Sequence, residues 1–303
     1  MPVYSELLPK FNDILPTLEH NQDVFGVDIG YRYEGQKRTS DLAVRIHAER
    51  LIPFISGHDV QLIHYIASVN ATHRILETEV DRRIPRLTMQ PGISIGYDTA
   101  GTLGILGYDV FTGSPKEAIL TCHHLVKGGS RWPIMQPSFS VDHGGRQHII
   151  GLVDRIDPNG DAAVISLLAR RQLRFEQFGT NDIITAIAEP ELGQVVMKSG
   201  RSTGITEGII DGIGTYFVKT PLKMRQAISA LRIVPVSPEN QENYEVSFAG
   251  DSGALWYKQG SKEGIGMLFY GEGNNVPPYL EFSLAQPLQE LFKRMHFTFN
   301  KIV

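Results

Sequence analysis

Cysteine is almost absent from this chain: Cys122 is the single one among 303 residues, so no disulfide can form within one molecule. Secreted domains commonly rely on disulfides, and we therefore expect a cytoplasmic protein. Basic residues are not in excess either, because 29 Lys and Arg face 33 Asp and Glu. Since nucleic-acid-binding surfaces are usually strongly basic, we expect no nucleic-acid partner.

Long apolar runs are also missing. No stretch of about 18 apolar residues occurs, and we expect no membrane span or membrane partner. The first segment, MPVYSELLPKFNDILPTLEH, carries charges and prolines throughout and does not predict a signal peptide. Phosphate-binding and dinucleotide-binding loops are lacking, and His143 and His148 in VDHGGRQH are too isolated to predict a metal site. We expect neither a metal nor a cofactor.

The pattern of apolar and polar residues changes near residues 85–90, from mixed helix-like and strand-like runs to short β-rich runs. We therefore place a domain boundary after residue 87. In residues 1–87, two alternating runs, DVFGVDIGYRY and LAVRIHAE, predict strands of a small sheet. Residues 5–18 predict a helix cut short by Pro9 and Pro16, and residues 56–69 predict an N-capped helix. This part is predicted to be an N-terminal α+β domain.

From residue 88 to residue 303, short β-rich runs follow one another with Gly, Asn, Asp and Pro between them. Such spacing is typical of an all-β sandwich or a pair of barrels. The run LAQPLQELFKRMHF, residues 284–297, has apolar residues at helical spacing and predicts a C-terminal helix. We therefore predict a mainly β fold for this second domain.

The segment SFAGDSGALWY places Ser252 between Gly250 and Gly253. As four residues alone, Gly-Asp-Ser-Gly is compatible with a plain turn or with a nucleophile. Gly250 can turn its N–H inward beside that of Ser252, and two such donors can hold the oxyanion of an acyl-transfer intermediate. A nucleophilic serine also needs a histidine base that is oriented by a carboxylate.

Two segments can supply these partners. AILTCHHLV ends a strand-like run with His123 and His124, of which only one can face the inner side. DPNGDAAVISLL offers Asp161 at the start of an apolar strand, where a buried charge without a partner would cost much free energy. Asp157 is the rival carboxylate, but it lies in the turn itself.

LTCHHLV, DAAVISL and GDSGALW, in that order, resemble the three signature segments of trypsin-like (chymotrypsin-fold) serine proteases. The resemblance implies a catalytic triad of His124, Asp161 and Ser252, with the amides of Gly250 and Ser252 as the oxyanion hole. From 124 to 161 is 37 residues and from 161 to 252 is 91, against roughly 45 and roughly 93 in the archetype. The resemblance further implies a chymotrypsin-like double β-barrel over residues 88–303.

The implied function is a serine endopeptidase that hydrolyses polypeptides through an acyl-enzyme, in an intracellular processing or regulatory role. The alternative is a catalytically silent pseudoprotease that binds peptides or partners as a scaffold. The complete triad argues against that alternative.

The substrate pocket departs from trypsin. Trypsins carry an acid six residues before the nucleophile, where this chain has Val246. Glu245 is one step away and would point to the opposite side of a regular strand. The resemblance therefore implies an apolar or mixed pocket, although Glu272 at its rim leaves a bias toward basic groups open. The implied substrate contacts are Val246, Phe269, Tyr270 and Gly271; core packing accounts equally well for Phe269 and Tyr270.

Activation also departs from the classical pattern. In trypsins a newly freed N-terminus pairs with the acid before the serine, here Asp251. This chain has a long segment ahead of the protease domain, so Asp251 needs another cation, or an activating or regulatory protein partner must order the site. Residues 25–53 resemble the region before the protease domain in bacterial and plant narrow-leaf-type trypsin-like proteases, which is compatible with a homo-oligomer.

Overall fold

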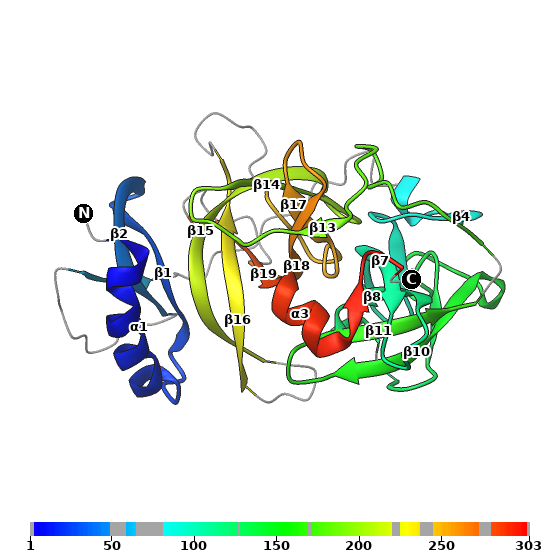
Figure 1. Ribbon diagram of the computed structural model, residues 1–303, viewed down its shortest axis with the longest axis horizontal. Coiled ribbons are helices and arrows are strands. Elements are labelled where there is room, and N and C mark those ends of the chain that lie inside the picture. The colour runs from blue at the N-terminus through cyan, green and yellow to red at the C-terminus, as the bar shows by residue number, and fades with distance from the viewer. Residues whose placement is uncertain are drawn as a thin grey trace.

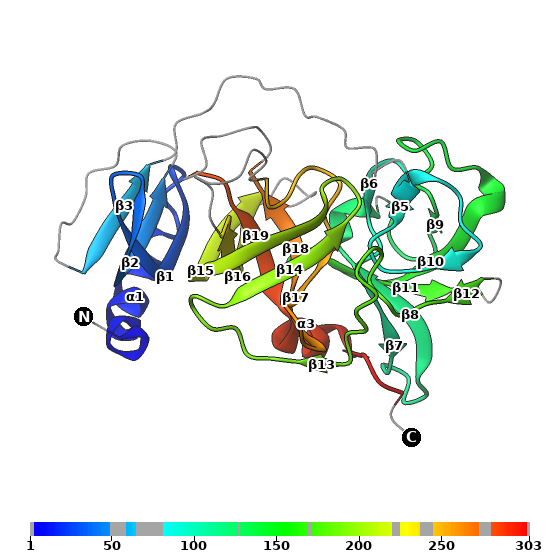
Figure 2. The same cartoon turned by 90° about the horizontal axis from the view of Figure 1, so that it is seen from above.

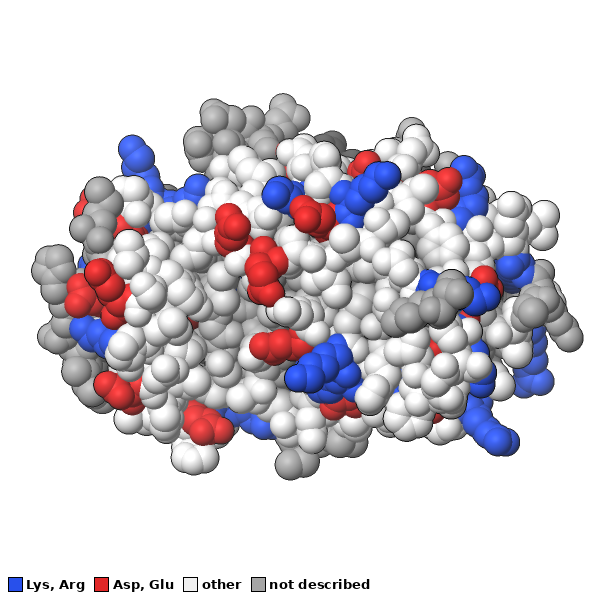
Figure 3. Space-filling view, in the orientation of Figure 1, with Lys and Arg blue, Asp and Glu red and all other residues white. Residues whose placement is uncertain are grey.

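Three groups of strands lie side by side along the long axis of the molecule, as Figures 1 and 2 show. The computed structural model describes residues 3–48, 59–64, 81–126, 128–168, 171–219, 225–236, 245–272 and 280–301. Within these ranges, no helix is long and apolar enough to cross a membrane. The face drawn in Figure 3 carries basic and acidic side chains in small groups between uncharged surface, as the balanced composition predicts.

The first barrel is an eight-stranded sheet in the order β20-β7-β8-β11-β10-β9-β5-β6. Its strands are β5 (Ser94–Gly96), β6 (Ala100–Thr102), β7 (Ile105–Asp109), β8 (Lys116–Thr121), β9 (Pro133–Met135), β10 (Ile149–Asp157), β11 (Ala162–Leu167) and β20 (Phe297–Thr298). A separate parallel pair joins β4 (Thr88–Met89) to β12 (Gln172–Leu173). The apolar faces of β7, β8 and β11 fill the barrel interior.

The second barrel follows the order β14-β17-β18-β19-β16-β15 and is closed by pairing of β14 with β15. Its strands are β14 (Val195–Gly200), β15 (Gly204–Lys219), β16 (Arg225–Val234), β17 (Leu255–Lys258), β18 (Glu263–Gly271) and β19 (Ser283–Pro287), with β13 (Ala186–Ile187) beside β18. The mainly β fold with two barrels confirms the prediction for this part of the chain.

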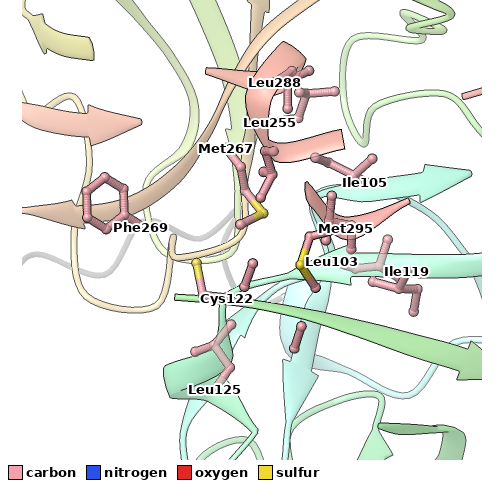
Figure 4. Packing of buried hydrophobic residues seen from close by; sticks show 14 of the residues in the cluster. Leu103, Ile105, Ile119, Cys122, Leu125, Leu255, Met267, Phe269, Leu288 and Met295 are labelled. Carbon is pink, nitrogen blue, oxygen red and sulfur yellow. The ribbon is translucent and has the colours of Figure 1, made fainter. Parts of the chain in front are cut away.

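The predicted C-terminal helix is present as α3 (Leu288–Met295), shorter than expected because β19 runs to Pro287. Figure 4 shows Leu288 beside Leu255 of the second barrel, and Met295 beside Leu103 and Ile105 of the first. All of these side chains are buried. The helix therefore fills the junction between the two barrels with apolar surface, the main source of stabilisation in folding.

The N-terminal part consists of α1 (Tyr4–Leu18), β1 (Val24–Glu34), β2 (Lys37–Ala48) and β3 (Val60–His64). β1 pairs with the C-terminal half of β15, so its strands continue the sheet of the second barrel. The helix runs through Pro9 and Pro16, contrary to the expected interruption. Each proline removes one helical hydrogen bond, but Leu7 and its apolar neighbours pack on β1 and β2 and hold the helix in place.

The predicted helix over residues 56–69 is wrong where the structure describes it. Residues 60–64 form β3, which pairs in parallel with β2; residues 56–58 and 65–69 lie outside the described residues. The segment forms a strand because, in a short apolar segment, pairing with a neighbouring strand outweighs the local preference for a helix. The division after residue 87 stays a prediction.

A buried ion cluster joins the N-terminal strands to the second barrel. Arg45 on β2 donates two hydrogen bonds to Asp28 on β1, both 2.7 Å, and one of 2.6 Å to Asp211 on β15. Arg232 on β16 also bonds to Asp211. Burial alone would raise the pKa of Asp28, but Arg45 and His47 hold it well below its ordinary value. The seam between the two parts is therefore charged and fully buried.

This cluster predicts that Arg45→Met lowers the free energy of unfolding by about 3 kcal/mol or more, because two buried carboxylates lose their shared cation. Urea denaturation followed by fluorescence measures the change. The matched control is Lys10→Met, which removes a partly exposed pair with Asp59 and should cost less than about 1 kcal/mol. Equal losses in the two variants would contradict the structural role of the cluster.

Candidate active site

The first barrel brings His124 and Asp161 together. His124 Nδ1 lies 2.7 Å from Asp161 Oδ2, and the His124 amide donates a 2.8 Å hydrogen bond to Asp161 Oδ1. Asp161 is buried and His124 is partly exposed. Because Nδ1 is held by the carboxylate, Nε2 is the ring nitrogen left to accept a proton.

Strand pairing explains this proximity. β8 and β11 are antiparallel with Thr121 opposite Ala163, so the end of β8 and the start of β11 lie at one edge. His124 follows β8 in the short 3₁₀ helix η2 (His123–Leu125), and Asp161 comes just before β11. Asp161 has a φ of 48°, in the left-handed region that aspartate tolerates better than most residues.

The rival residues have other partners or surroundings. Asp157 forms an ion pair with Arg294 at 2.5 Å and accepts a hydrogen bond from the Gly160 amide. His123 is buried, and burial lowers its pKa. The structure thus brings His124, and not its neighbour, to Asp161.

Ser252 comes from the second barrel, in the turn before β17. The Thr102 amide at the end of β6 donates a 2.8 Å hydrogen bond to the Ser252 carbonyl, so the turn is fastened to the first barrel. Gly253 has a φ of 93° and no room for a side chain, since a Cβ there would lie 2.6 Å from the Thr102 carbonyl oxygen. The glycine after the serine is therefore required by the close approach of the two barrels.

One cavity of about 600 Å³ contains all three side chains in its lining. Within the described ranges, Ser252 Oγ makes no hydrogen bond to His124, and the Gly250 and Ser252 amides donate none to other residues. Catalytic hydrogen bonds often tighten only when substrate binds. The two free amides on the turn that carries Ser252 match the donors that an oxyanion hole needs.

The structure separates the four implied substrate contacts into two groups. Phe269, Tyr270 and Gly271, at the end of β18, line the cavity. Phe269 also packs in the core, whereas Tyr270 is 46% exposed. Val246 is not in the cavity lining: its side chain is buried among the apolar residues of the second barrel. The strand-like alternation instead turns the next residue, Ser247, toward the cavity.

Asp251 has an internal cation. Lys198 on β14 places its Nζ 3.1 Å from Asp251 Oδ2, and both side chains are fully buried. The Thr203 hydroxyl and the amides of Ser202 and Phe248 donate to the same carboxylate. Burial opposes ionisation of Asp251, but Lys198 and these donors hold its pKa below the ordinary value.

Lys198 was missed in the sequence, although the need for a cation was apparent. It stands in QVVMKSG, where an alternating strand predicts an outward lysine as readily as a buried one. Its 53-residue separation from Asp251 hides the pairing from any local pattern.

A metal has one candidate position in the described part of the chain. Cys122, His124 and Asp161 have ligand atoms within 4.8 Å of one another. Two of these atoms already bond to each other, and Cys122 Sγ lies 3.1 Å from the Leu268 carbonyl oxygen. Burial raises the pKa of Cys122, which disfavours the thiolate that a metal would need.

The Lys198–Asp251 pair predicts a large effect of Lys198→Met. An unpaired buried carboxylate beside Ser252 should lower the free energy of unfolding by about 3–5 kcal/mol, measured by urea denaturation. Lys258→Met, which removes an exposed pair with Glu263, is the control and should cost less than about 1 kcal/mol. If Lys198→Met were as mild as this control, the pair would not organise the turn that carries Ser252.

No protein-family model matches the sequence, and no curated protein matches it. Solved structures do match. A Nocardiopsis protease (NAPase) has a TM-score of 0.51 at 16% identity, covering 70% of this chain and 98% of its own. Thermobifida fusca protease A has a TM-score of 0.52 at 15% identity, and the match covers 71% of this chain and 100% of that protease. A serine protease described as glutamic acid specific has a TM-score of 0.51 at 16% identity, and the match covers 70% of this chain and 100% of that protease. The chain therefore has the fold of chymotrypsin-like serine proteases, as the three sequence segments predicted.

Proposed function

We propose that this protein is a serine endopeptidase that hydrolyses polypeptides through an acyl-enzyme. The observation that supports this function best is the arrangement around one cavity of an oriented histidine, its buried carboxylate and a serine on a glycine turn. A single cysteine cannot form a disulfide within one molecule, which suits an intracellular role.

The steps follow from the groups at the cavity. Ser252 Oγ attacks the scissile carbonyl carbon while its proton passes to His124 Nε2. The oxygen that becomes negative accepts hydrogen bonds from the Gly250 and Ser252 amides. His124 then gives the proton to the leaving amine, and Asp161 stabilises the imidazolium between the two transfers. Water then attacks the acyl carbon while His124 Nε2 takes its proton, and His124 returns that proton to Ser252 Oγ as the acyl group leaves.

The second candidate is a pseudoprotease that binds peptides in this cavity without turnover. The absence of a Ser252–His124 hydrogen bond within the described residues favours it. The intact Asp161–His124 pair and the free amides of the nucleophile turn favour the enzyme, because a binding scaffold needs neither.

Labelling by a fluorophosphonate probe tests the proposal. Wild type should be labelled and Ser252→Ala should not, because the probe requires the activated hydroxyl. His124→Ala should lower the labelling rate by on the order of 10⁴-fold or more, and Asp161→Asn by about 10⁴-fold, since the histidine loses its orienting acceptor.

His123→Ala is the matched control, since it removes the adjacent imidazole but not the one bonded to Asp161. It should retain labelling within about ten-fold of wild type. Folded wild type that binds peptides but is never labelled would contradict the peptidase and favour the scaffold. Equal losses for His123→Ala and His124→Ala in folded proteins would contradict the assigned base.

A further inference from the structure

The Ser202 side chain lies against the turn that carries Ser252. Its hydroxyl donates a 2.7 Å hydrogen bond to the Ala249 carbonyl oxygen, and its amide donates one of 2.7 Å to the Asp251 carboxylate. These two acceptors stand on either side of Gly250, whose amide is one of the two proposed oxyanion donors. Ser202 therefore holds the chain on both sides of that donor, although it is buried and does not line the cavity.

The hydrogen bond to Ala249 sets the direction of the Gly250 amide. The Ala249 carbonyl and the Gly250 N–H belong to one planar trans peptide unit, in which they point in opposite directions. Because the carbonyl points to Ser202, the N–H points away from it, toward the side on which Ala249 and Ser252 line the cavity. Rotating this peptide unit by half a turn would break the hydrogen bond to Ser202 and withdraw the donor from the cavity.

Gly250 permits this arrangement because it has no side chain. Its φ is 102°, in the region that favours glycine. A Cβ there would lie 2.5 Å from Ser202 Oγ and 2.6 Å from Arg201 Nη1. Any other residue at this position would therefore push the serine hydroxyl and the guanidinium away from the turn.

Arg201 fixes the Ser202 hydroxyl in its turn. Its Nη1 donates a 3.0 Å hydrogen bond to Ser202 Oγ, which leaves the single hydroxyl proton for the Ala249 carbonyl. The rest of the guanidinium pairs with Asp142: Nε donates a 2.8 Å hydrogen bond to Oδ2, and Nη2 donates to the other oxygen. The Arg201 and Asp142 side chains are only 7% and 4% exposed. Asp142 lies between β9 and β10, so these contacts run from the first barrel to the peptide unit that carries the donor.

Building on the peptidase function proposed above, we propose that Ser202 is a positioning residue that keeps the Gly250 amide directed at the oxyanion, and that Arg201 and Asp142 hold Ser202 in place for this role. Ser202 acts through Gly250, since its own side chain does not line the cavity. Ser202→Ala leaves the Ala249 carbonyl without this donor, and the peptide unit can then rotate. The loss of one oxyanion donor lowers the rate of acyl transfer by about 10²-fold to 10³-fold.

Fluorophosphonate labelling of full-length Ser202→Ala protein tests this role, with Ser199→Ala as the matched control. Ser199 is also buried, accepts a hydrogen bond from Arg82 and donates one of 2.7 Å to a backbone carbonyl, that of Phe178. Ser202→Ala should lower the labelling rate by about 10²-fold, and Ser199→Ala should stay within about three-fold of wild type. The pH dependence of the rate should be the same in both variants, because the base, His124, is untouched.

Nuclear magnetic resonance follows the same peptide unit without turnover. The dipeptide Ala-Gly occurs twice in the sequence, at residues 100–101 and 249–250. Protein with ¹³C at its alanine carbonyls and ¹⁵N at its glycine amides therefore gives two signals that join a labelled carbonyl to the next amide. Ser202→Ala should displace or double the Gly250 signal and leave the Gly101 signal, the internal control, in place.

If Ser202→Ala fails to fold, Asp142→Asn gives a second measure, because the amide weakens the pair with Arg201 and should lower the labelling rate by about three-fold to ten-fold. A Gly250 signal that does not respond to Ser202→Ala, or equal losses of labelling in Ser202→Ala and Ser199→Ala, would overturn the positioning role. Wild type that is labelled, with no loss in Ser202→Ala, contradicts only this role. Wild type that is never labelled, with a Gly250 signal that responds, contradicts only the peptidase.

Discussion

The ion pair between Lys198 and Asp251 is the interaction on which the site depends. The Asp251 carboxylate, next to Ser252 and removed from water, needs a compensating cation and hydrogen-bond donors, and these fix the position of the chain around it. Lys198 belongs to β14, and the donors from Ser202 and Thr203 belong to the turn that follows. The pair therefore holds the turn that carries Ser252 against the closing strands of the second barrel, without a freed chain terminus.

The barrel interface applies a second constraint, because the residues of the proposed triad are divided between two sheets. His124 and Asp161 are fixed within the first barrel by the pairing of β8 with β11. Ser252 belongs to the second, and its turn is fastened across the interface by the Thr102 amide. The proposed proton transfer from Ser252 to His124 requires that these sheets keep their relative position, which the apolar contacts of α3 with both barrels stabilise.

The sequence predicted those site residues whose chemistry requires a local motif. Ser252 needs its glycines, and His124 and Asp161 need strand ends, so each leaves a short pattern around itself. Lys198 leaves none, because its contribution comes from a partner far along the chain. The same physics explains the errors in the fold: β3 is a strand because β2 pairs with it, and α1 survives its prolines because the sheet covers its apolar face.

The N-terminal strands are joined to the chemistry through β15. This strand pairs with β1 along residues 212–216 and then continues to Val218 and Lys219 at the cavity. Asp211 on the same strand is neutralised in part by Arg45 from β2. Detaching the N-terminal strands would therefore expose an unpaired edge and take one cation from a buried carboxylate. The wall of the cavity formed by the end of β15 thus depends on residues that precede the two barrels in the chain, so this N-terminal part supports the candidate site physically.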